Sequence, residues 1–315
     1  MAAIPLVDTH VHFHDLTHPK LRYAWLEPGA PVDEVTGPDA AIRAQRYWAD
    51  DFVAETRFHN VSKVVHVQAA IGSADPVEET RWLQGFADRL GVPHGIVAYA
   101  DLTRPDAART LARHAAYRNL RGIRDLRYDR YLTDPAWHRG YAQLARHGLV
   151  CCDDPAVEEM ADARRLAERH PGVTLCVDHA GYPRRRDRAY FAHWRAAMRD
   201  LARAPNVVVK ISGLGQADHR WTVGSLRPWV RECVELFGPD RAFFGTNWPV
   251  DRLYSSYGDV VDAYAEIISD LPEGERHALF HGTAERVFRL GGEPGDAHGG
   301  KPGRASGEEH GGEAA

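Results

Sequence analysis

Lys63–Gln68, with the sequence KVVHVQ, is a short apolar run rich in valine, a pattern typical of a strand buried on both faces of a parallel sheet. Seven similar runs occur along the chain, and amphipathic helical patterns lie between them. This alternation predicts βα units, and eight such units close a (β/α)8 barrel. The other runs are Pro5–Asp8, Gly95–Ala100, Leu120–Arg124, Leu149–Asp153, Thr174–Asp178, Val207–Ile211 and Ala242–Gly245.

Two of the helical patterns end at a glycine, Gly91 and Gly238, as expected where a helix C-terminus needs a left-handed residue. A doubly wound open sheet is the alternative architecture. It would carry a glycine-rich phosphate loop after its first strand, where this chain has the sequence HVH. We therefore predict an α/β fold with a single (β/α)8 TIM barrel over residues 1–290.

Two segments do not fit the βα pattern. Residues 16–37 are rich in proline, glycine and aromatic residues and are too long for a tight turn after the first strand. We expect this insertion to lie over the C-terminal ends of the strands as a lid. Residues 291–315 are a low-complexity sequence without an apolar face, which predicts a disordered C-terminal tail.

The charge balance argues against polyanionic partners. The net charge of −5 arises from 39 basic and 44 acidic residues that are interspersed, so we expect no binding to nucleic acid or to a membrane surface. The N-terminal residues lack the basic and apolar regions of a secretory signal, and no apolar stretch is long enough to span a membrane. We expect a cytoplasmic protein, with a homo-oligomer compatible with the sequence.

The four cysteines are too few for a disulfide scaffold in a chain of 315 residues, and none belongs to a CxxC pair. We interpret them as reduced, buried residues rather than as a zinc–thiolate site. They are Cys151, Cys152, Cys176 and Cys233.

Polar residues that end a barrel strand are the best candidates for the active site, because the C-terminal ends of the strands form the mouth of the barrel. His10 and His12 follow the first run, and residues two apart on an extended strand point to the same side. Both imidazoles could therefore reach one metal ion or one substrate oxygen. The alternative is that they are hydrogen-bonded histidines of an ordinary loop.

Two other strands direct polar residues to the same mouth. His179 ends the sixth run, although a single histidine at a strand end is often structural. The eighth run is followed by Asn247 and, four residues later, Asp251. Three strands thus point to one place.

The motifs DTHVHFH (8–14), VDHAG (177–181), VVVKISGL (207–214) and FFGTNWPVD (243–251) resemble, in this order and spacing, the lactonase-type branch of the amidohydrolase superfamily. The resemblance extends from Val7 to about Leu290. It implies that His10, His12 and His179 polarise the carbonyl of a cyclic ester, directly or through a divalent metal. It also implies an aspartate at the end of the eighth strand that activates water.

This chain departs from the family at that last position, which is Asn247, and a neutral amide cannot accept a proton from water. Asp251 is the nearest replacement in sequence, and Asp153 is the nearest by barrel position. Asp251 could instead pair with an arginine at the surface, and Asp153 or its neighbour Asp154 could only cap a helix.

A divalent metal, zinc or manganese, could be held by His10, His12 and His179, but without the aspartate the set lacks the anionic ligand that such sites usually have. No organic cofactor is expected.

Several residues are candidates for substrate binding. Arg124 could hold a substrate carboxylate through its planar guanidinium, and Lys210 could either do the same or form a buried salt bridge. Aromatic residues near the mouth could line the pocket or belong to the core. These are Tyr99, Trp25 and Trp248, and further candidates for an anion site, or for a solvated face, are Arg127, Arg130, Arg184, Arg185 and Arg186.

From these residues and the resemblance we expect a hydrolase that acts on the ester bond of a small acidic or sugar-derived lactone. The alternatives are a decarboxylase or lactone isomerase of the same superfamily, or a binding protein without catalytic activity.

Overall fold

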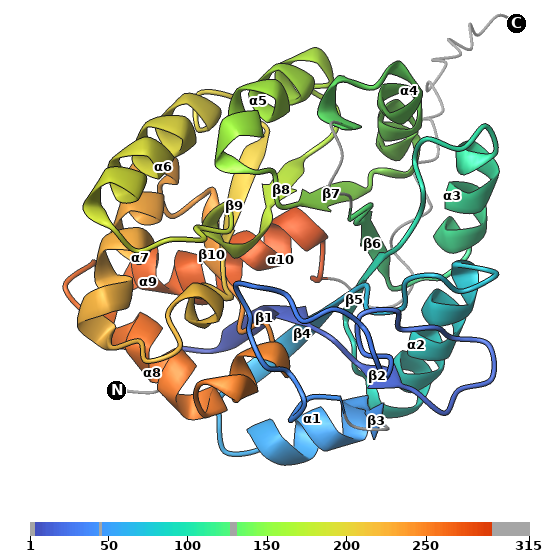
Figure 1. Ribbon diagram of the computed structural model, residues 1–315, viewed down its shortest axis with the longest axis horizontal. Helices are drawn as coiled ribbons and strands as arrows, with labels where there is room; N and C mark the ends of the chain where they lie inside the picture. Colours follow the sequence, from blue (N-terminus) through green and yellow to red (C-terminus); the bar gives the residue numbers. More distant parts are fainter. Residues whose placement is uncertain (1–3, 44–45, 127–130, 292–315) are drawn as a thin grey trace, which may run out of the picture.

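The fold is a barrel of eight parallel strands surrounded by helices, as the spacing of the apolar runs predicts (Figure 1). The computed structural model describes residues 4–43, 46–126 and 131–291. Each strand is hydrogen-bonded to the one that follows it around the barrel. In this order they are β1 (Leu6–Val11), β4 (Val61–Val67), β5 (Gly95–Ala98), β6 (Leu120–Ile123), β7 (Val150–Asp153), β8 (Leu175–Val177), β9 (Val207–Ile211) and β10 (Ala242–Phe244).

The last strand returns to the first and closes the barrel. Val11 forms a parallel bridge with Trp248, and the His12 N–H donates to the Trp248 carbonyl at 2.7 Å. The Thr9 hydroxyl donates to the carbonyl of Phe244 in β10, also at 2.7 Å. Closure therefore fixes the end of β1, which carries the paired histidines.

Helices pack around the outside of the barrel, and their ends have physical causes. Gly91 ends α2 with a φ of 75°, and Gly238 follows α7, as predicted. The α-helices are α1 (Ala49–Thr56), α2 (Val77–Leu90), α3 (Ala107–Ala115), α4 (Pro135–Gln143), α5 (Met160–Arg169), α6 (Arg188–Leu201), α7 (Val223–Phe237), α8 (Tyr257–Ile267), α9 (Glu273–His277) and α10 (Thr283–Phe288). Short helical turns are η1 (Tyr131–Thr133), η2 (Leu144–His147), η3 (Val157–Glu159), η4 (Asp178–Ala180), η5 (Leu214–Ala217), η6 (Val250–Leu253) and the π-helical η7 (Ala278–Gly282).

An irregularity in β1 determines which side chains of this strand enter the barrel. The segment from Asp8 to Val11 spans three steps along β1, while the paired segment from Val64 to His66 spans only two. Such a β-bulge adds one residue and changes the alternation of side chains. As a result Val7 packs inside the lower barrel, and His10 also points inward higher up the same strand.

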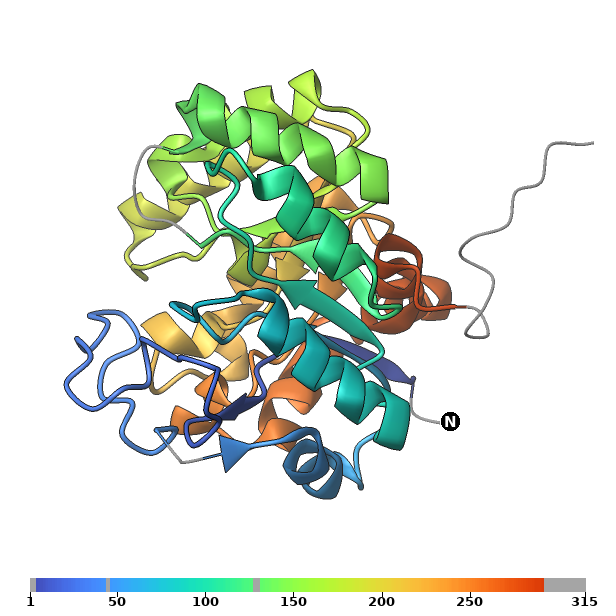
Figure 2. The ribbon, with the colours of Figure 1, turned by 90° about the vertical axis from the view of Figure 1, so that its right-hand side faces the viewer.

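The two ends of the barrel are covered differently. At the end where the strands begin, Ala284 and Phe288 of α10 pack against Val7, Val65 and the other interior valines. At the opposite end lies the long segment between β2 (His14–Asp15) and β3 (Arg46–Tyr47). Figure 2 shows this segment and α10 on opposite sides of the barrel.

The predicted lid contacts the loops around the mouth. The Trp25 indole donates to the Ala69 carbonyl after β4, Thr36 donates to Gln216 after β9, and the Tyr182 hydroxyl donates to Asp33. The insertion therefore lies across the C-terminal ends of the strands, as expected. The predicted disordered tail, apart from Gly291, lies outside the described residues.

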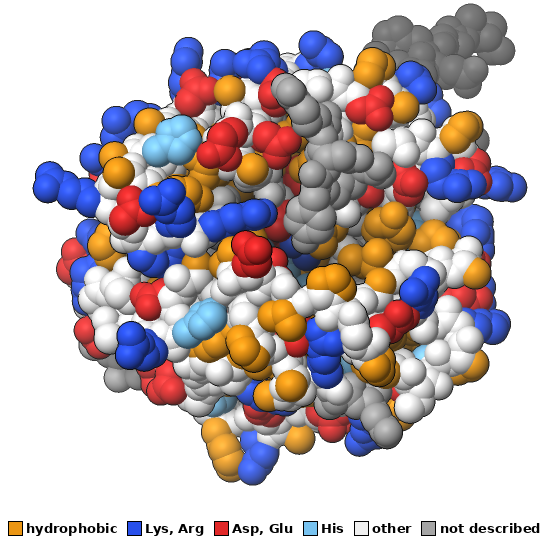
Figure 3. All heavy atoms as spheres, in the orientation of Figure 1, with side chains coloured by type: hydrophobic (Ala, Val, Ile, Leu, Met, Phe, Trp, Pro, Cys, Tyr) orange, Lys and Arg blue, Asp and Glu red, His pale blue; other side chains and the backbone are white. Residues whose placement is uncertain are grey.

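Acidic and basic side chains alternate over the face that surrounds the mouth, as the interspersed charges of the sequence predict (Figure 3). Among the described residues, no helix combines the length and the apolar character that crossing a bilayer requires.

Candidate active site

The three predicted histidines meet inside the mouth of the barrel. The ring of His10 lies 4.8 Å from that of His12 and 4.4 Å from that of His179, measured between centroids. All three residues are buried. The paired histidines from β1 and the single histidine after β8 therefore form one cluster.

Hydrogen bonds define which nitrogens of the pair carry protons. The Val67 carbonyl can only accept, so His12 donates to it through Nδ1, at 2.9 Å, and leaves Nε2 unprotonated. His10 Nε2 lies 3.1 Å from His12 Nε2 and is then the donor between them. His10 Nδ1 is left to accept from the Lys210 ammonium at 3.3 Å. A chain of donors thus runs from Lys210 through both imidazoles to the barrel wall.

His179 is held by an unusual backbone. It lies in the turn η4 with a φ of 53°, and Ala180, Gly181 and Tyr182 also have positive φ. A left-handed conformation in residues other than glycine stores strain and is often found at functional sites. The turn brings His179 Nδ1 within 3.0 Å of the Ser212 hydroxyl after β9.

Gly213 provides the space for this arrangement. It has a φ of 61°, and a Cβ at this position would lie 2.5 Å from His179 Nδ1. A side chain here would collide with the imidazole, so the glycine that follows Ser212 is required by the position of His179.

A buried ionic cluster lies directly below the histidines. Asp178 Oδ1 is 2.8 Å from Lys210 Nζ, and Asp178 Oδ2 is 3.4 Å from Arg124 Nε and 3.8 Å from His10 Nδ1. Lys210 and Asp178 are fully buried. Of the two interpretations of Lys210, the buried salt bridge is the one observed, and Arg124 is engaged in the same cluster.

Burial and this cluster keep the imidazoles neutral. Burial lowers the pKa of His10 well below its usual value, and the Lys210 charge lowers it further. Burial also lowers the pKa of His179, to about 3, although Asp178 opposes this effect. The pKa of His12 is likewise lowered well below its usual value by burial and by Arg124. At neutral pH the site therefore presents three neutral imidazoles next to buried cations.

The geometry of this pair is compatible with a divalent metal. Two imidazole nitrogens bound to one tetrahedral zinc ion lie about 3.3 Å apart, close to the observed 3.1 Å between His10 Nε2 and His12 Nε2. Binding would require His10 to carry its proton on Nδ1, which faces Asp178 Oδ2 at 3.8 Å, just beyond hydrogen-bond distance. The pair therefore fits a metal, and His179 is the additional candidate ligand.

A second group with potential metal ligands lies deeper in the barrel. Cys152, Cys176 and Asp178 have ligand atoms within 4.8 Å of one another. Lys210 Nζ is 3.9 Å from Cys152 Sγ and already pairs with Asp178. Burial raises the pKa of the Cys176 thiol well above its usual value, so it is protonated. The Lys210 ammonium thus supplies the cation that this group needs, and all four cysteines are free and buried as predicted.

The predicted residues after β10 form a pair of their own. Asn247 has a φ of 60° and its amide donates to Asp251 Oδ1 at 2.9 Å. Asp251 is buried, and burial raises its pKa to about 7. The guanidinium of Arg252, the adjacent arginine, binds Glu55 instead. The surface ion pair considered for Asp251 is therefore not the arrangement observed.

Asp153, the other aspartate considered as a base, and its neighbour Asp154 both have structural partners. Asp153 accepts from the Tyr131 hydroxyl at 2.5 Å, and Asp154 lies 3.4 Å from Arg124. The helix α5 begins at Met160, so neither aspartate caps it. Asp153 thus anchors the turn η1, and Asp154 compensates the charge of Arg124.

The aromatic candidates differ in position. The Trp25 ring lies 6.1 Å from that of His12 and so covers the histidine cluster from the lid. The backbone of Trp248 pairs with His12, but its indole packs against Tyr257 and donates to Glu55. Tyr99 directly follows β5, and its role in substrate binding stays a prediction.

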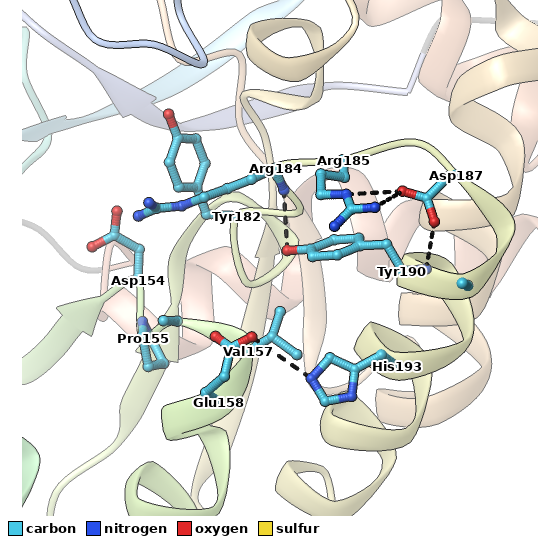
Figure 4. Close-up of a pocket in the computed structure, with 12 residues that line it drawn as sticks. Asp154, Pro155, Val157, Glu158, Tyr182, Arg184, Arg185, Asp187, Tyr190 and His193 are labelled. Carbon is cyan, nitrogen blue, oxygen red and sulfur yellow. Dashed lines mark hydrogen bonds and ion pairs between the residues drawn. The ribbon is translucent and has the colours of Figure 1, made fainter.

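A cavity of about 470 Å3 lies between the loops after β7 and β8 (Figure 4). Its wall includes Asp154, Tyr182 and Arg184. Arg184, Arg185 and Arg186 also line a larger hollow of about 990 Å3 under the lid. The arginine run is therefore next to the mouth, as considered from the sequence, whereas Arg127 and Arg130 lie outside the described residues.

Two contributors to the site were not identified from the sequence. Asp178 lies beside His179 in the VDHAG motif, and alternation along β8 could have indicated that it points inward with Cys176. Ser212, which contacts His179, had no such signal, because its approach depends on the left-handed turn.

Comparison with known proteins identifies relatives over nearly the whole chain. A family model described as amidohydrolase matches residues 7–290. A protein of Sinorhizobium fredii (strain NBRC 101917 / NGR234), y4mH, is 38% identical over 302 residues, which are 92% of this chain and 100% of that protein. An L-fucono-1,5-lactonase of Burkholderia multivorans is 32% identical over 310 residues, with 92% and 98% covered.

Among solved structures, an amidohydrolase of Burkholderia multivorans with bound zinc is similar, with a TM-score of 0.78 and 29% identity. The match covers 91% of this chain and 100% of that one. These findings confirm the resemblance to the lactonase-type branch.

Proposed function

The chain belongs to the amidohydrolase family, and from this premise we propose that it hydrolyses the ester bond of a small lactone. The observation that carries the proposal is the cluster of His10, His12 and His179 in the barrel mouth. The name of the L-fucono-1,5-lactonase relative supports a sugar-derived lactone as the substrate.

The chain's own charges suit this reaction. Attack of water on a lactone carbonyl places negative charge on the carbonyl oxygen, and preorganised donors and cations stabilise such charge strongly in a dry site. The Lys210 ammonium, 3.3 Å from His10 Nδ1, is such a cation beside the imidazoles, while Asp178 and Asp154 balance the overall charge of Lys210 and Arg124. The lactone carbonyl would bind with its oxygen toward this cluster.

A divalent metal, zinc or manganese, would be held by His10 and His12, with His179 as a further ligand. When bound, it would supply Lewis-acid polarisation of the carbonyl. The zinc in the Burkholderia multivorans relative supports this part of the proposal.

Asp251 is the proposed general base. A base works best when its pKa is near the working pH, and burial raises the pKa of Asp251 to about 7. Asn247, which occupies the position of the family aspartate, donates to Asp251 and orients its carboxylate. In this proposal the carboxylate has moved four residues along the chain, and the amide positions it.

The test is an assay of the purified protein against sugar lactones, with His179→Ala as the variant and the exposed His147→Ala as the control. Loss of a group that stabilises the oxyanion lowers kcat by about 100- to 1,000-fold. His147→Ala should match the parent. If His179→Ala were as active as the parent, the site assignment would be wrong, and release of carbon dioxide from a hydroxybenzoate would favour the decarboxylase alternative.

The proposed metal binding can be tested separately from the activity. After dialysis against zinc, the parent and His147→Ala should retain zinc, and His12→Ala should lose it, as measured by elemental analysis. Equal zinc contents in His12→Ala and the parent would exclude the proposed ligands without affecting the assay above.

A further inference from the structure

The cavity between the loops after β7 and β8 adjoins the histidine cluster through two contacts. The Tyr182 ring in its wall lies 5.9 Å from the ring of His179. Asp154, also in its wall, lies 3.4 Å from Arg124, which in turn contacts Asp178. The wall of this cavity therefore contacts His179 through Tyr182 and Arg124 through Asp154, although none of the three histidines lines it.

The acidic groups of the cavity already have partners. Asp154 faces Arg124, and Asp187 pairs with Arg185 at 2.8 Å while it caps α6. Glu158 is 3.8 Å from His193 on the side of the cavity that α6 forms. Asp154 interacts electrostatically with Arg184 but forms its ion pair with Arg124, so one carboxylate is shared between two guanidinium groups.

Arg184 is the exception in this balance. Within the described ranges, no carboxylate lies within 4.0 Å of its guanidinium, which instead lies over the Tyr182 ring at 5.1 Å. Figure 4 shows Arg184 extended toward Tyr182 and Asp154, and Arg185 turned away toward Asp187. Arg184 also lines the hollow under the lid, so it stands between the two open volumes.

The buried cations are already engaged in ion pairs. Lys210 is fully buried and is bound to Asp178. Arg124 is buried between Asp178 and Asp154. A negative group of the substrate would have to displace one of these carboxylates, whereas at Arg184 it would fill an open position.

We propose that Arg184 binds a second, anionic group of the substrate, so that lactones carrying a carboxylate are preferred over neutral ones. This inference rests on the proposed lactone hydrolysis and names its substrate class. A planar guanidinium pairs with a carboxylate through two parallel hydrogen bonds, which lysine cannot reproduce. Stacking on Tyr182 holds the guanidinium at the inner wall of the cavity.

The test uses pairs of substrates that differ in one group. The 1,4-lactones of gluconic and glucaric acid, and those of galactonic and galactaric acid, differ only by a hydroxymethyl group in place of a carboxylate. We expect the parent to have a higher kcat/KM for the acidic member of at least one pair. Arg184→Gln should lower that value about tenfold, mainly through KM, and leave the neutral member unchanged.

Two further variants separate recognition from a structural effect. Arg184→Lys retains the charge but not the planar fork and should recover only part of the loss. Arg188→Gln removes an exposed charge from the same segment, outside the cavity, and should behave as the parent. If Arg184→Gln affected both lactones equally or neither of them, the inference would be overturned.

Binding measurements keep the inference testable if no lactone is hydrolysed. Calorimetry with open-chain glucarate and gluconate needs no turnover. Tighter binding of glucarate that is lost in Arg184→Gln would support the anion site even if the proposed reaction were wrong. Equal binding of glucarate by the parent and Arg184→Gln would refute the site.

Discussion

Asp251 combines burial with a single amide partner, and this combination gives it a pKa suited to proton transfer. Burial disfavours its charged form, and the Asn247 amide and the Gly215 backbone offset the effect only in part. A carboxyl with a pKa of about 7 is ionised in about half of the molecules at neutral pH. The residue is therefore both a candidate base and a source of pH dependence.

We predict that kcat/KM of the parent rises with pH through about 7, because the base acts only when ionised. In Asp251→Asn this rise of kcat/KM with pH should disappear, and kcat/KM itself should fall by about 100- to 10,000-fold. The exposed variant Asp270→Asn should retain both the activity and the profile. An Asp251→Asn protein with an unchanged pH profile would contradict the prediction.

Stability provides a folding control for the same variant. A carboxyl whose folded pKa is raised contributes stability below its unfolded pKa, and this contribution is lost as the pH rises through about 7. Asp251→Asn has no such group, so its free energy of unfolding should not fall below that of the parent at pH 8. Urea titrations at pH 6 and pH 8 measure this.

The sequence predicted the residues of the histidine cluster better than their surroundings. Alternation along one strand was enough to place His10 and His12 on one side, and the end of an apolar run placed His179. The salt bridge between Lys210 and Asp178 could not be predicted from the sequence, because the two residues follow different strands and meet only in the closed barrel. The ion pair of Arg124 with Asp178 could not be predicted for the same reason, so the sequence was equally consistent with Arg124 binding the substrate.

At the level of elements, apolar runs predicted the eight strands to within a few residues, because strands buried on both faces are apolar throughout. The turn η4 was not predictable. Positive φ is uncommon in residues other than glycine, and tertiary contacts such as the one with Ser212 hold His179 and Ala180 in this conformation. The bulge in β1 was not predictable either, because it depends on how β1 pairs with β4.

Two helical glycines give opposite predictions for the same substitution. In α4, a Cβ on Gly140 would lie 2.1 Å from the backbone carbonyl oxygen of Leu102, so Gly140→Ala should destabilise by about 1–3 kcal/mol or more. In α2, Gly85 is exposed and a Cβ there would meet nothing within 4 Å. Gly85→Ala should therefore stabilise by about 0.5–1 kcal/mol.

Chemical denaturation of both glycine variants measures the difference directly. The substitutions add the same methyl group, so any difference in their sign comes from the approach of the helix to its neighbour. Equal changes in the free energy of unfolding would mean that α4 does not pack on the Leu102 backbone as described.

At the scale of the whole molecule, the core packed around α10 and the candidate active site lie at opposite ends of the barrel. Phe288 of α10 is fully buried against Phe243 at the end where the strands begin. The histidines lie at the other end, under the lid. The separation is characteristic of barrels, whose active sites lie at the C-terminal ends of the strands.

We predict that Phe288→Ala destabilises the protein by about 3–5 kcal/mol, because it leaves a large cavity in the barrel base. Val287→Ala, which shortens a partly buried neighbour, should cost clearly less. Thermal unfolding compares the two. Should both variants unfold at the temperature of the parent, α10 would not be part of the core.

The extra residue in β1 makes the reaction centre depend on the pairing register of one strand as well as on its sequence. If the bulge were lost while the sequence stayed the same, Thr9 would lie opposite Val65 and His10 opposite His66. Val65 faces the barrel interior and His66 faces Glu79 of α2, so the imidazole of His10 would turn toward the surrounding helices. A protein with every histidine present could thus have a complete barrel and lack the paired imidazoles in its mouth.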